Sequence, residues 1–169
     1  QDVALGGQGA PLVPIGDMYL FEDFKYCLNL GGFANISSKE EKNIYAFDIC
    51  PMNTVLNHYC KIIGSEFDAD GNFSKEGSLN KKLFNHLNSI PYYEKKLPKS
   101  LGIEFVNKII FPIIENYKIE IKDILNTYIH HVAYQIKKNV DTENEILITG
   151  GGAYNKTLVN YLKKEKLKI

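Results

Sequence analysis

The pattern of hydrophobic and polar residues shows three short, mainly apolar runs near the start of the chain. The runs KYCLNL, FANIS and NIYAFDI are rich in β-branched and aromatic residues, and a double glycine and the polar stretch SKEEKN separate them. This spacing is typical of strands joined by tight hairpin turns. We therefore predict that residues 25–49 form a three-strand antiparallel meander within one sheet.

The period of the pattern then becomes helical. Apolar residues recur at helical spacing after Asn53, a good N-cap residue, until Gly64 ends the run. The apolar positions of this run are Val55, Leu56, Tyr59, Ile62 and Ile63. The next stretch, DADGNFSKEG at 68–77, is predicted to be a loop.

Helical patterns dominate much of the remaining chain. We interpret residues at about 74–117 as a helical insert broken at Pro91, Pro98 and Pro112. A further helix is predicted over 121–138. Its apolar face consists of Ile124, Leu125, Tyr128, Ile129, Val132 and Ile136.

The chain ends in a strand, a glycine turn and a helix. The strand is predicted at 146–149, joining the same sheet, the helix begins near Asn155, and a short last strand is an option at 167–169. This order of elements favours a mixed α/β layer. The predicted core is Leu28, Leu30, Ile36, Ala46, Phe47, Leu56, Ile129, Val132, Leu147 and Ile148.

Composition narrows the class of protein. A chain of 169 residues with 44% hydrophobic and 24% charged residues is typical of one folded domain with a core. Its 20 basic and 20 acidic residues give a net charge of zero, which argues against nucleic acid and anionic membrane as partners. Cys27, Cys50 and Cys60 lie in apolar runs without CxxC spacing, so we expect buried free thiols. With no membrane-spanning or export segment in the pattern, we expect a cytoplasmic protein.

Two glycine clusters are candidate ligand sites. Gly31 and Gly32 lie between two predicted strands, where both can adopt positive φ in a tight turn, or where their amides can approach a phosphate with Asn35 as a further donor. The cluster 150–152, consisting of Gly150, Gly151 and Gly152, lies between a strand and a helix. It is either a plain turn or a site where helix amides bind a nucleotide or sugar.

Asp48 is the candidate catalytic residue. It ends an apolar strand, so burial would make its carboxylate more basic, although an aspartate here can equally cap the following turn. No metal site is predicted. His130 and His131 are adjacent and face different ways on a helix, and the aspartate-rich stretch 68–72 lacks the spacing of a calcium loop.

Six motifs together resemble one family. DVALGGQGAPLVP, LNLGGFANIS, FDICPMN, FDADG, PKSLGIE and ITGGGAYN occur in the order seen in anhydro-N-acetylmuramic acid kinases, across nearly the whole chain. That family belongs to the sugar kinase, Hsp70 and actin superfamily. The resemblance implies that residues 1–169 are one ribonuclease H-like lobe, the second of two, with the meander, a mixed sheet and the helical insert.

The resemblance also implies a bacterial reaction of peptidoglycan recycling. Water opens the 1,6-anhydro bridge of anhydro-N-acetylmuramic acid while O6 receives the γ-phosphoryl group of ATP, with Mg²⁺ as the metal. The binding partner would be the amino-sugar substrate, and the resemblance leaves open whether the protein forms a homodimer.

Each implied role falls on a matching residue. Asp48 matches the base that activates the water. Gly7, Gln8, Gly9 and Asn35 would bind the sugar, and the nucleotide would bind at Gly31, Gly32, Gly150, Gly151, Gly152 and Asn155. The chain departs from the common family motif at Ile49, Cys50 and Met52, where threonine and two glycines are usual. The alternative function is a non-catalytic sugar-binding or regulatory module with the same fold.

Overall fold

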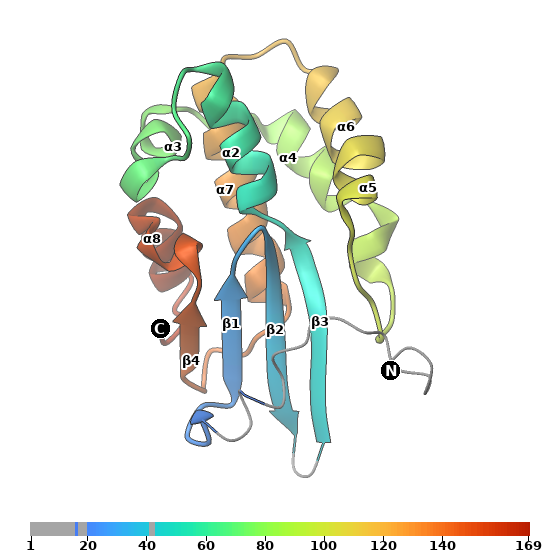
Figure 1. The fold of residues 1–169 in the computed structure, drawn as a ribbon, viewed down its shortest axis with the longest axis vertical. Helices are drawn as coiled ribbons and strands as arrows, with labels where there is room; N and C mark the ends of the chain where they lie inside the picture. The colour runs from blue at the N-terminus through green and yellow to red at the C-terminus, as the bar shows by residue number, and fades with distance from the viewer. Residues whose placement is uncertain (1–15, 17–19, 41–42) are drawn as a thin grey trace.

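A mixed sheet of four strands forms the centre of the molecule (Figure 1). The structure is a computed structural model and describes residues 16, 20–40 and 43–169. The strands, in the spatial order β3-β2-β1-β4, are β1 (Tyr26–Leu30), β2 (Phe33–Glu40), β3 (Asn43–Pro51) and β4 (Ile146–Thr149). The first three pair antiparallel, and β4 pairs parallel with β1, so the predicted meander and its added strand are confirmed.

Strand register divides the sheet into an apolar and a more polar face. Leu28 pairs with Ile36 on one side and with Ile148 on the other, and Ile36 pairs with Phe47. Because directly paired residues point to the same face of a sheet, these four form an apolar row. Figure 1 shows α7 (Ile121–Lys138) behind the sheet, where its buried residues complete the core.

The remaining elements of the described residues are helical. They are α2 (Asn53–Ile62), η2 (Ala69–Gly71), α3 (Asn72–Glu76), α4 (Lys81–Asn88), η3 (Pro91–Glu94), α5 (Ile103–Phe105), the π-turn η4 (Val106–Ile110), α6 (Phe111–Glu115), η5 (Gly151–Tyr154) and α8 (Lys156–Lys164). The bounds predicted for α7 are confirmed, and every residue of its predicted apolar face is buried. Most of the segment interpreted as a helical insert is helical.

Helix α2 differs from its prediction at both ends. Asn53 is the first helical residue, and the N-cap is Met52. The Asn53 side chain donates a hydrogen bond to the Leu30 carbonyl at 3.1 Å. Ile62 and Ile63 are 60% and 38% exposed, because the helix runs past the edge of the core before it ends.

Two further expectations about local structure are wrong. Residues 68–77 are not a loop: Asp68 accepts hydrogen bonds from the Phe73 and Ser74 amides, and this supports η2 and α3. Pro112 does not break its helix, because α5, the π-turn and α6 form one uninterrupted helical run over 103–115, and the π-turn just before Pro112 changes the hydrogen-bond pattern where the N–H is missing. The optional last strand is only a single bridge between Glu145 and Lys168.

Three predicted core residues are only half-buried. Ala46 and Leu147 alternate to the face opposite Phe47 and Ile146, whereas Ile148 lies on the apolar face but on the edge strand β4. The remaining predicted core residues are buried. The three cysteines are buried, and none forms a disulfide within the described residues. Within the described residues, no helix is long and apolar enough to cross a membrane.

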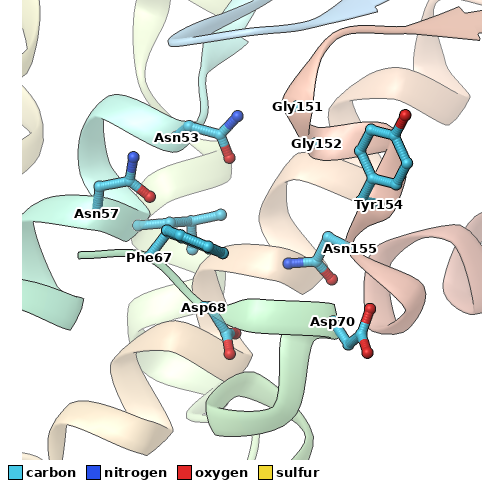
Figure 2. Close-up of a pocket in the computed structure, with 10 residues that line it drawn as sticks. Asn53, Asn57, Phe67, Asp68, Asp70, Gly151, Gly152, Tyr154 and Asn155 are labelled. Atoms are coloured by element: carbon cyan, nitrogen blue, oxygen red, sulfur yellow. The ribbon is translucent and has the colours of Figure 1, made fainter. Parts of the chain in front are cut away.

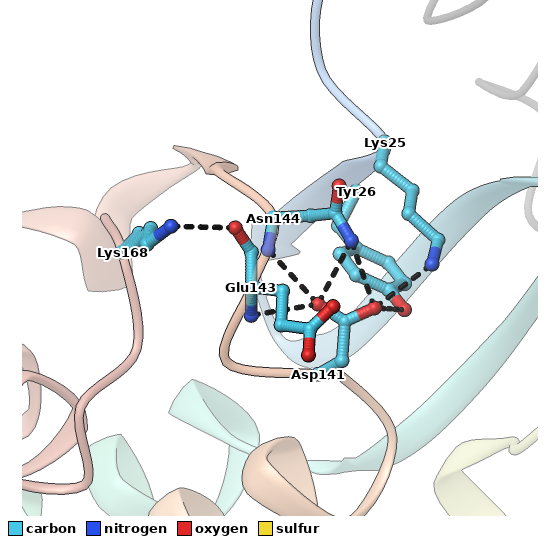
Figure 3. A network of polar contacts seen from close by, with 6 residues as sticks. All are labelled: Lys25, Tyr26, Asp141, Glu143, Asn144 and Lys168. Carbon is cyan, nitrogen blue, oxygen red and sulfur yellow. Dashed lines mark hydrogen bonds and ion pairs between the residues drawn. The ribbon is translucent and has the colours of Figure 1, made fainter.

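A polar network lies at the end of the sheet where β1 begins (Figure 3). Asp141, in the connection from α7 to β4, accepts hydrogen bonds from Lys25 Nζ at 2.8 Å and from Tyr26 Oη at 2.9 Å. Asn144 donates to both oxygens of the same carboxylate. Together with Lys25, these donors hold the pKa of Asp141 well below its usual range. The network fixes the start of β4 beside the start of β1.

Candidate functional site

The first glycine turn, Gly31 and Gly32, is held by the start of α2. The Gly32 carbonyl accepts from the Met52 and Thr54 amides at 2.8 and 3.1 Å, and the Gly31 carbonyl accepts from the Asn53 amide at 3.3 Å. Neither glycine has positive φ, so the predicted turn conformation is wrong. At Gly32 glycine is favoured instead by close packing, since a Cβ there would lie 2.9 Å from Thr54 Oγ1, whereas a Cβ on Gly31 would come no closer than 3.5 Å to Asn29 Nδ2.

The second glycine turn, 150–152, packs against β1. Gly150 has a φ of +80°, and a Cβ there would lie 2.5 Å from Asn29 Oδ1 and 2.9 Å from the Leu30 carbonyl oxygen. A Cβ on Gly152 would lie 2.2 Å from Met52 Cε. The two turns are therefore packed together through Leu30 and Met52, and the second cannot carry larger residues at Gly150 or Gly152.

Asn155 connects the second turn to α8. Its Oδ1 accepts from the Leu158 amide at 2.9 Å, so the predicted start of this helix is confirmed and one amide of its N-terminus is already bonded. Thr157 Oγ1 donates to the Gly71 carbonyl at 2.8 Å. These contacts fix α8 beside η2, across a pocket from α2.

That pocket has a volume of about 480 Å³. It is lined by Asn53, Leu56, Asn57, Phe67, Asp68, Asp70, Gly151, Gly152, Tyr154 and Asn155. Figure 2 shows Phe67 and Tyr154 on opposite sides of it, and these rings are 59% and 79% exposed. We name it the aromatic pocket, and its exposed rings suit a flat, partly apolar ligand.

A second pocket of about 660 Å³ adjoins it. It is lined by Gly31, Gly32, Asn53, Thr54, Asn57, His58, Lys61, Ile103, Asn107 and Phe111, and we name it the glycine-turn pocket. Asn53 and Asn57 line both pockets. The two predicted glycine sites therefore open onto adjoining spaces along one helix, α2.

The candidate base Asp48 lies in a polar row across the sheet. It pairs with Asn35, Asn35 pairs with Asn29, and Asn29 pairs with Thr149. The structure thus brings together two predicted site residues, Asp48 and Asn35. Neither of them lines the aromatic or the glycine-turn pocket, and Asn35 Nδ2 lies 3.5 Å from the Phe33 carbonyl oxygen.

Asp48 is buried, with its carboxylate in contact with a backbone amide. Its Oδ2 accepts from the Leu101 amide at 2.8 Å, and its own carbonyl accepts from Tyr92 Oη at 2.6 Å. Burial raises the pKa of Asp48, and the Leu101 amide opposes this only in part. The carboxylate fixes the segment before α5 to β3, while its role as a base stays a prediction.

Some predicted site residues fall outside the described part of the chain, namely Gly7, Gln8 and Gly9. Among the described residues, no cluster of three or more histidine, cysteine or acidic side chains could hold a metal ion. The two carboxylates that line the aromatic pocket already have partners. Asp68 binds the amides that begin α3, and Asp70 lies 3.0 Å from Lys156 Nζ.

Sequence reasoning missed the pocket-lining residues that follow the glycine turns. Asn53 and Asn57 are one helical turn apart on the polar side of α2, and Asn53 was assigned only a capping role. Phe67 lies just before the stretch interpreted as a loop, and Tyr154 follows the second glycine turn. Tyr154 could have been identified as an aromatic residue next to a glycine turn, whereas no sequence signal marks Phe67.

Comparison with known proteins identifies a family over nearly the entire chain. The family model described as "Anhydro-N-acetylmuramic acid kinase" matches residues 1–168. A protein of that name from Clostridioides difficile (strain 630) is 32% identical over 99% of this chain and 48% of its own length. One from Vibrio parahaemolyticus serotype O3:K6 is 34% identical over 96% of this chain and 47% of its own length. The chain spans about half the length of these relatives.

Solved structures resemble the fold at low identity. The activator of the 2-hydroxyisocaproyl-CoA dehydratase from Clostridium difficile with bound ADPNP matches with a TM-score of 0.51 and 19% identity, over 92% of this chain and 56% of that one. Component A of the (R)-2-hydroxyglutaryl-CoA dehydratase from Acidaminococcus fermentans matches with a TM-score of 0.53 and 14% identity, over 90% and 56%. These matches bear out the predicted fold class.

Proposed function

This chain belongs to the anhydro-N-acetylmuramic acid kinase family, and on that basis we propose that it is the nucleotide-binding half of an ATP-dependent sugar kinase. The proposal for the whole protein is that water opens the 1,6-anhydro bridge of anhydro-N-acetylmuramic acid while O6 receives the γ-phosphoryl group of ATP. The products are N-acetylmuramic acid 6-phosphate and ADP.

One observation carries the proposal of nucleotide binding: the two glycine turns open onto adjoining pockets that share Asn53 and Asn57. We assign the base to the aromatic pocket, because exposed rings such as Phe67 and Tyr154 can stack on it. We assign the phosphates to the glycine-turn pocket, because backbone without side chains permits close approach. Lys61 also lines this pocket and supplies positive charge, although its Nζ lies 3.5 Å from Glu66 Oε2. A structural neighbour has ADPNP bound, which supports nucleotide binding by a protein of this fold.

Phosphoryl transfer depends mainly on positioning and on charge supplied around the phosphates. In this proposal the nucleotide is assigned to the described residues of the two pockets, and the sugar to Asn35 and to Gly7, Gln8 and Gly9. Asp48 is proposed to take a proton from the attacking water. Burial favours this by raising its pKa, although its bond to the Leu101 amide must leave one oxygen available.

The described residues do not fit a Mg²⁺ ion. Carboxylates are the side chains that Mg²⁺ prefers, yet no carboxylate lines the glycine-turn pocket and both of those in the aromatic pocket have partners. We therefore assign no step to a metal held by these residues.

Two measurements test the proposal. Isothermal titration of the 169-residue chain should show ATP binding that excess adenosine weakens, because both would occupy the aromatic pocket. An enzyme that contains this chain together with the rest of the kinase should release ADP only when anhydro-N-acetylmuramic acid is present, with the 6-phosphate detected by mass. The chain alone should show no turnover. Sugar binding without any nucleotide binding or turnover would favour the non-catalytic module instead.

A further inference from the structure

Asn57 lies at the junction of the two pockets. It is on α2, one turn after Asn53, and lines both the aromatic pocket and the glycine-turn pocket. Figure 2 shows its carboxamide directed toward the aromatic pocket. A ligand that extends from one pocket into the other would pass this side chain.

The hydrogen bonding of the two asparagines differs. Asn53 Nδ2 donates to the Leu30 carbonyl at 3.1 Å and so helps to attach α2 to the first glycine turn. Asn57 is half-buried, and within the described part of the chain its carboxamide makes no hydrogen bond. Asn57 therefore retains one donor group and one acceptor group for a ligand.

The part of a nucleotide that connects the base to the phosphates is ribose. With the base in the aromatic pocket and the phosphates in the glycine-turn pocket, the 2′- and 3′-hydroxyls would come beside Asn57. Each hydroxyl can donate and accept a hydrogen bond, and a carboxamide offers both complementary groups. We propose that Asn57 binds the ribose hydroxyls and makes the site selective for ribonucleotides; this inference rests on the proposed nucleotide-binding function.

The test compares ATP with 2′-deoxy-ATP and 3′-deoxy-ATP by isothermal titration of the 169-residue chain. One neutral hydrogen bond contributes roughly 0.5–1.5 kcal/mol, so wild type should bind at least one deoxy analogue about two- to tenfold more weakly than ATP. Asn57→Ala should lose affinity for ATP by the same factor and lose none for that analogue. Asn85→Ala, which removes an exposed asparagine on α4, should behave as wild type.

The outcomes separate the inference from the function it rests on. If wild type binds ATP and its deoxy analogues equally, or if Asn57→Ala still discriminates between them, Asn57 does not bind the ribose. In that case the proposed nucleotide site stands. If wild type binds no ATP, both proposals fail. Thermal melting of Asn57→Ala without ligand should match wild type, because this side chain supports no other part of the structure.

Discussion

Met52 and Gly152 are in contact where the start of α2 meets the second glycine turn. The contact is so close that a Cβ on Gly152 would lie 2.2 Å from Met52 Cε and 2.8 Å from Leu30 Cβ. Met52 is fully buried at a position where the family motif usually has glycine. The larger side chain thus fills space between the two turns, and its partner has to be glycine.

Alanine substitutions at two neighbouring positions of the second turn should therefore differ in their effect on the free energy of unfolding: Gly152→Ala should be destabilising and Gly151→Ala should not. Gly152→Ala should lower the free energy of unfolding by roughly 1–3 kcal/mol, the usual cost of overpacking, and should weaken ATP binding. Gly151→Ala is the matched control, because nothing lies within 4 Å of its added Cβ. Urea unfolding of both variants checks this. Equal stabilities would contradict the packing between Met52 and Gly152.

The exposed rings of the aromatic pocket should contribute to binding but not to stability. Phe67→Ala and Tyr154→Ala should each weaken ATP binding about fivefold or more, because stacking on a base contributes roughly 1–3 kcal/mol. Their melting temperatures should stay near that of wild type, since the rings are 59% and 79% exposed. Tyr134→Ala, at an exposed ring outside both pockets, is the control. If both pocket variants bind ATP as tightly as wild type, the assignment of the nucleotide base to the aromatic pocket is wrong.

Substitutions of Asp48 separate a base from a structural carboxylate. Asp48→Asn keeps an acceptor for the Leu101 amide and removes a charge that burial disfavours, so its stability at neutral pH should stay within about 1 kcal/mol of wild type. Asp48→Ala removes the acceptor and should lose roughly 1–3 kcal/mol. In the intact kinase, Asp48→Asn should lower kcat by about 10²- to 10⁴-fold if Asp48 is the base. A folded Asp48→Asn enzyme with normal turnover would leave only the structural role.

His131 should make the fold sensitive to acid. It is fully buried, with Nδ1 2.8 Å from Asn88 Oδ1 and Nε2 3.0 Å from Tyr93 Oη, and burial lowers its pKa from 6.5 to about 3. Below pH 6.5 the unfolded chain binds a proton that the folded chain does not, so stability should fall as the pH falls toward 3. The loss from His131 alone should reach roughly 1.5–2 kcal/mol between pH 6.5 and about pH 5.

Urea unfolding at a series of pH values measures this effect. His131→Gln should be less stable at neutral pH and should lose that part of the pH dependence, because it has no titrating group at the buried position. His86→Gln, at an exposed histidine on α4, should keep the dependence of wild type. A His131→Gln variant with an unchanged slope would assign the acid sensitivity to other groups.

Local patterns predicted most of the elements. Short apolar runs bounded by turn residues predicted β1 to β4, and helical spacing predicted the bounds of α7. The pattern was misleading where a tertiary contact decides the structure. Asn53 has the residue type of an N-cap, yet the Gly31 and Gly32 carbonyls already accept the first amides of α2, so its side chain bonds to Leu30 instead.

The candidate site was predicted only in part. Glycine content identified both turns, but the reason for glycine at Gly32 is the nearby Thr54 hydroxyl rather than positive φ, and no local pattern contains that contact. Asp48 lies beside Asn35 because of the pairing register between β2 and β3. This register depends on a bulge between Ala34 and Asn35, which the local sequence pattern of a hairpin does not predict. Asn57 lines both pockets because α2 is fixed by the first turn.

The parallel pairing of β1 with β4 also affects how the chain folds. Tyr26 pairs with Ile146, so this edge of the sheet closes a loop that contains α2, the helical segments after it and α7. Pairing between residues so distant in sequence is intrinsically slow, and a chain emerging from the ribosome cannot make it until β4 has been synthesised. The first glycine turn can form early with the meander, whereas the second must wait for this strand. The aromatic pocket, which Gly151, Gly152, Tyr154 and Asn155 help to line, can therefore be complete only late in folding, after most of the hydrophobic core has been synthesised.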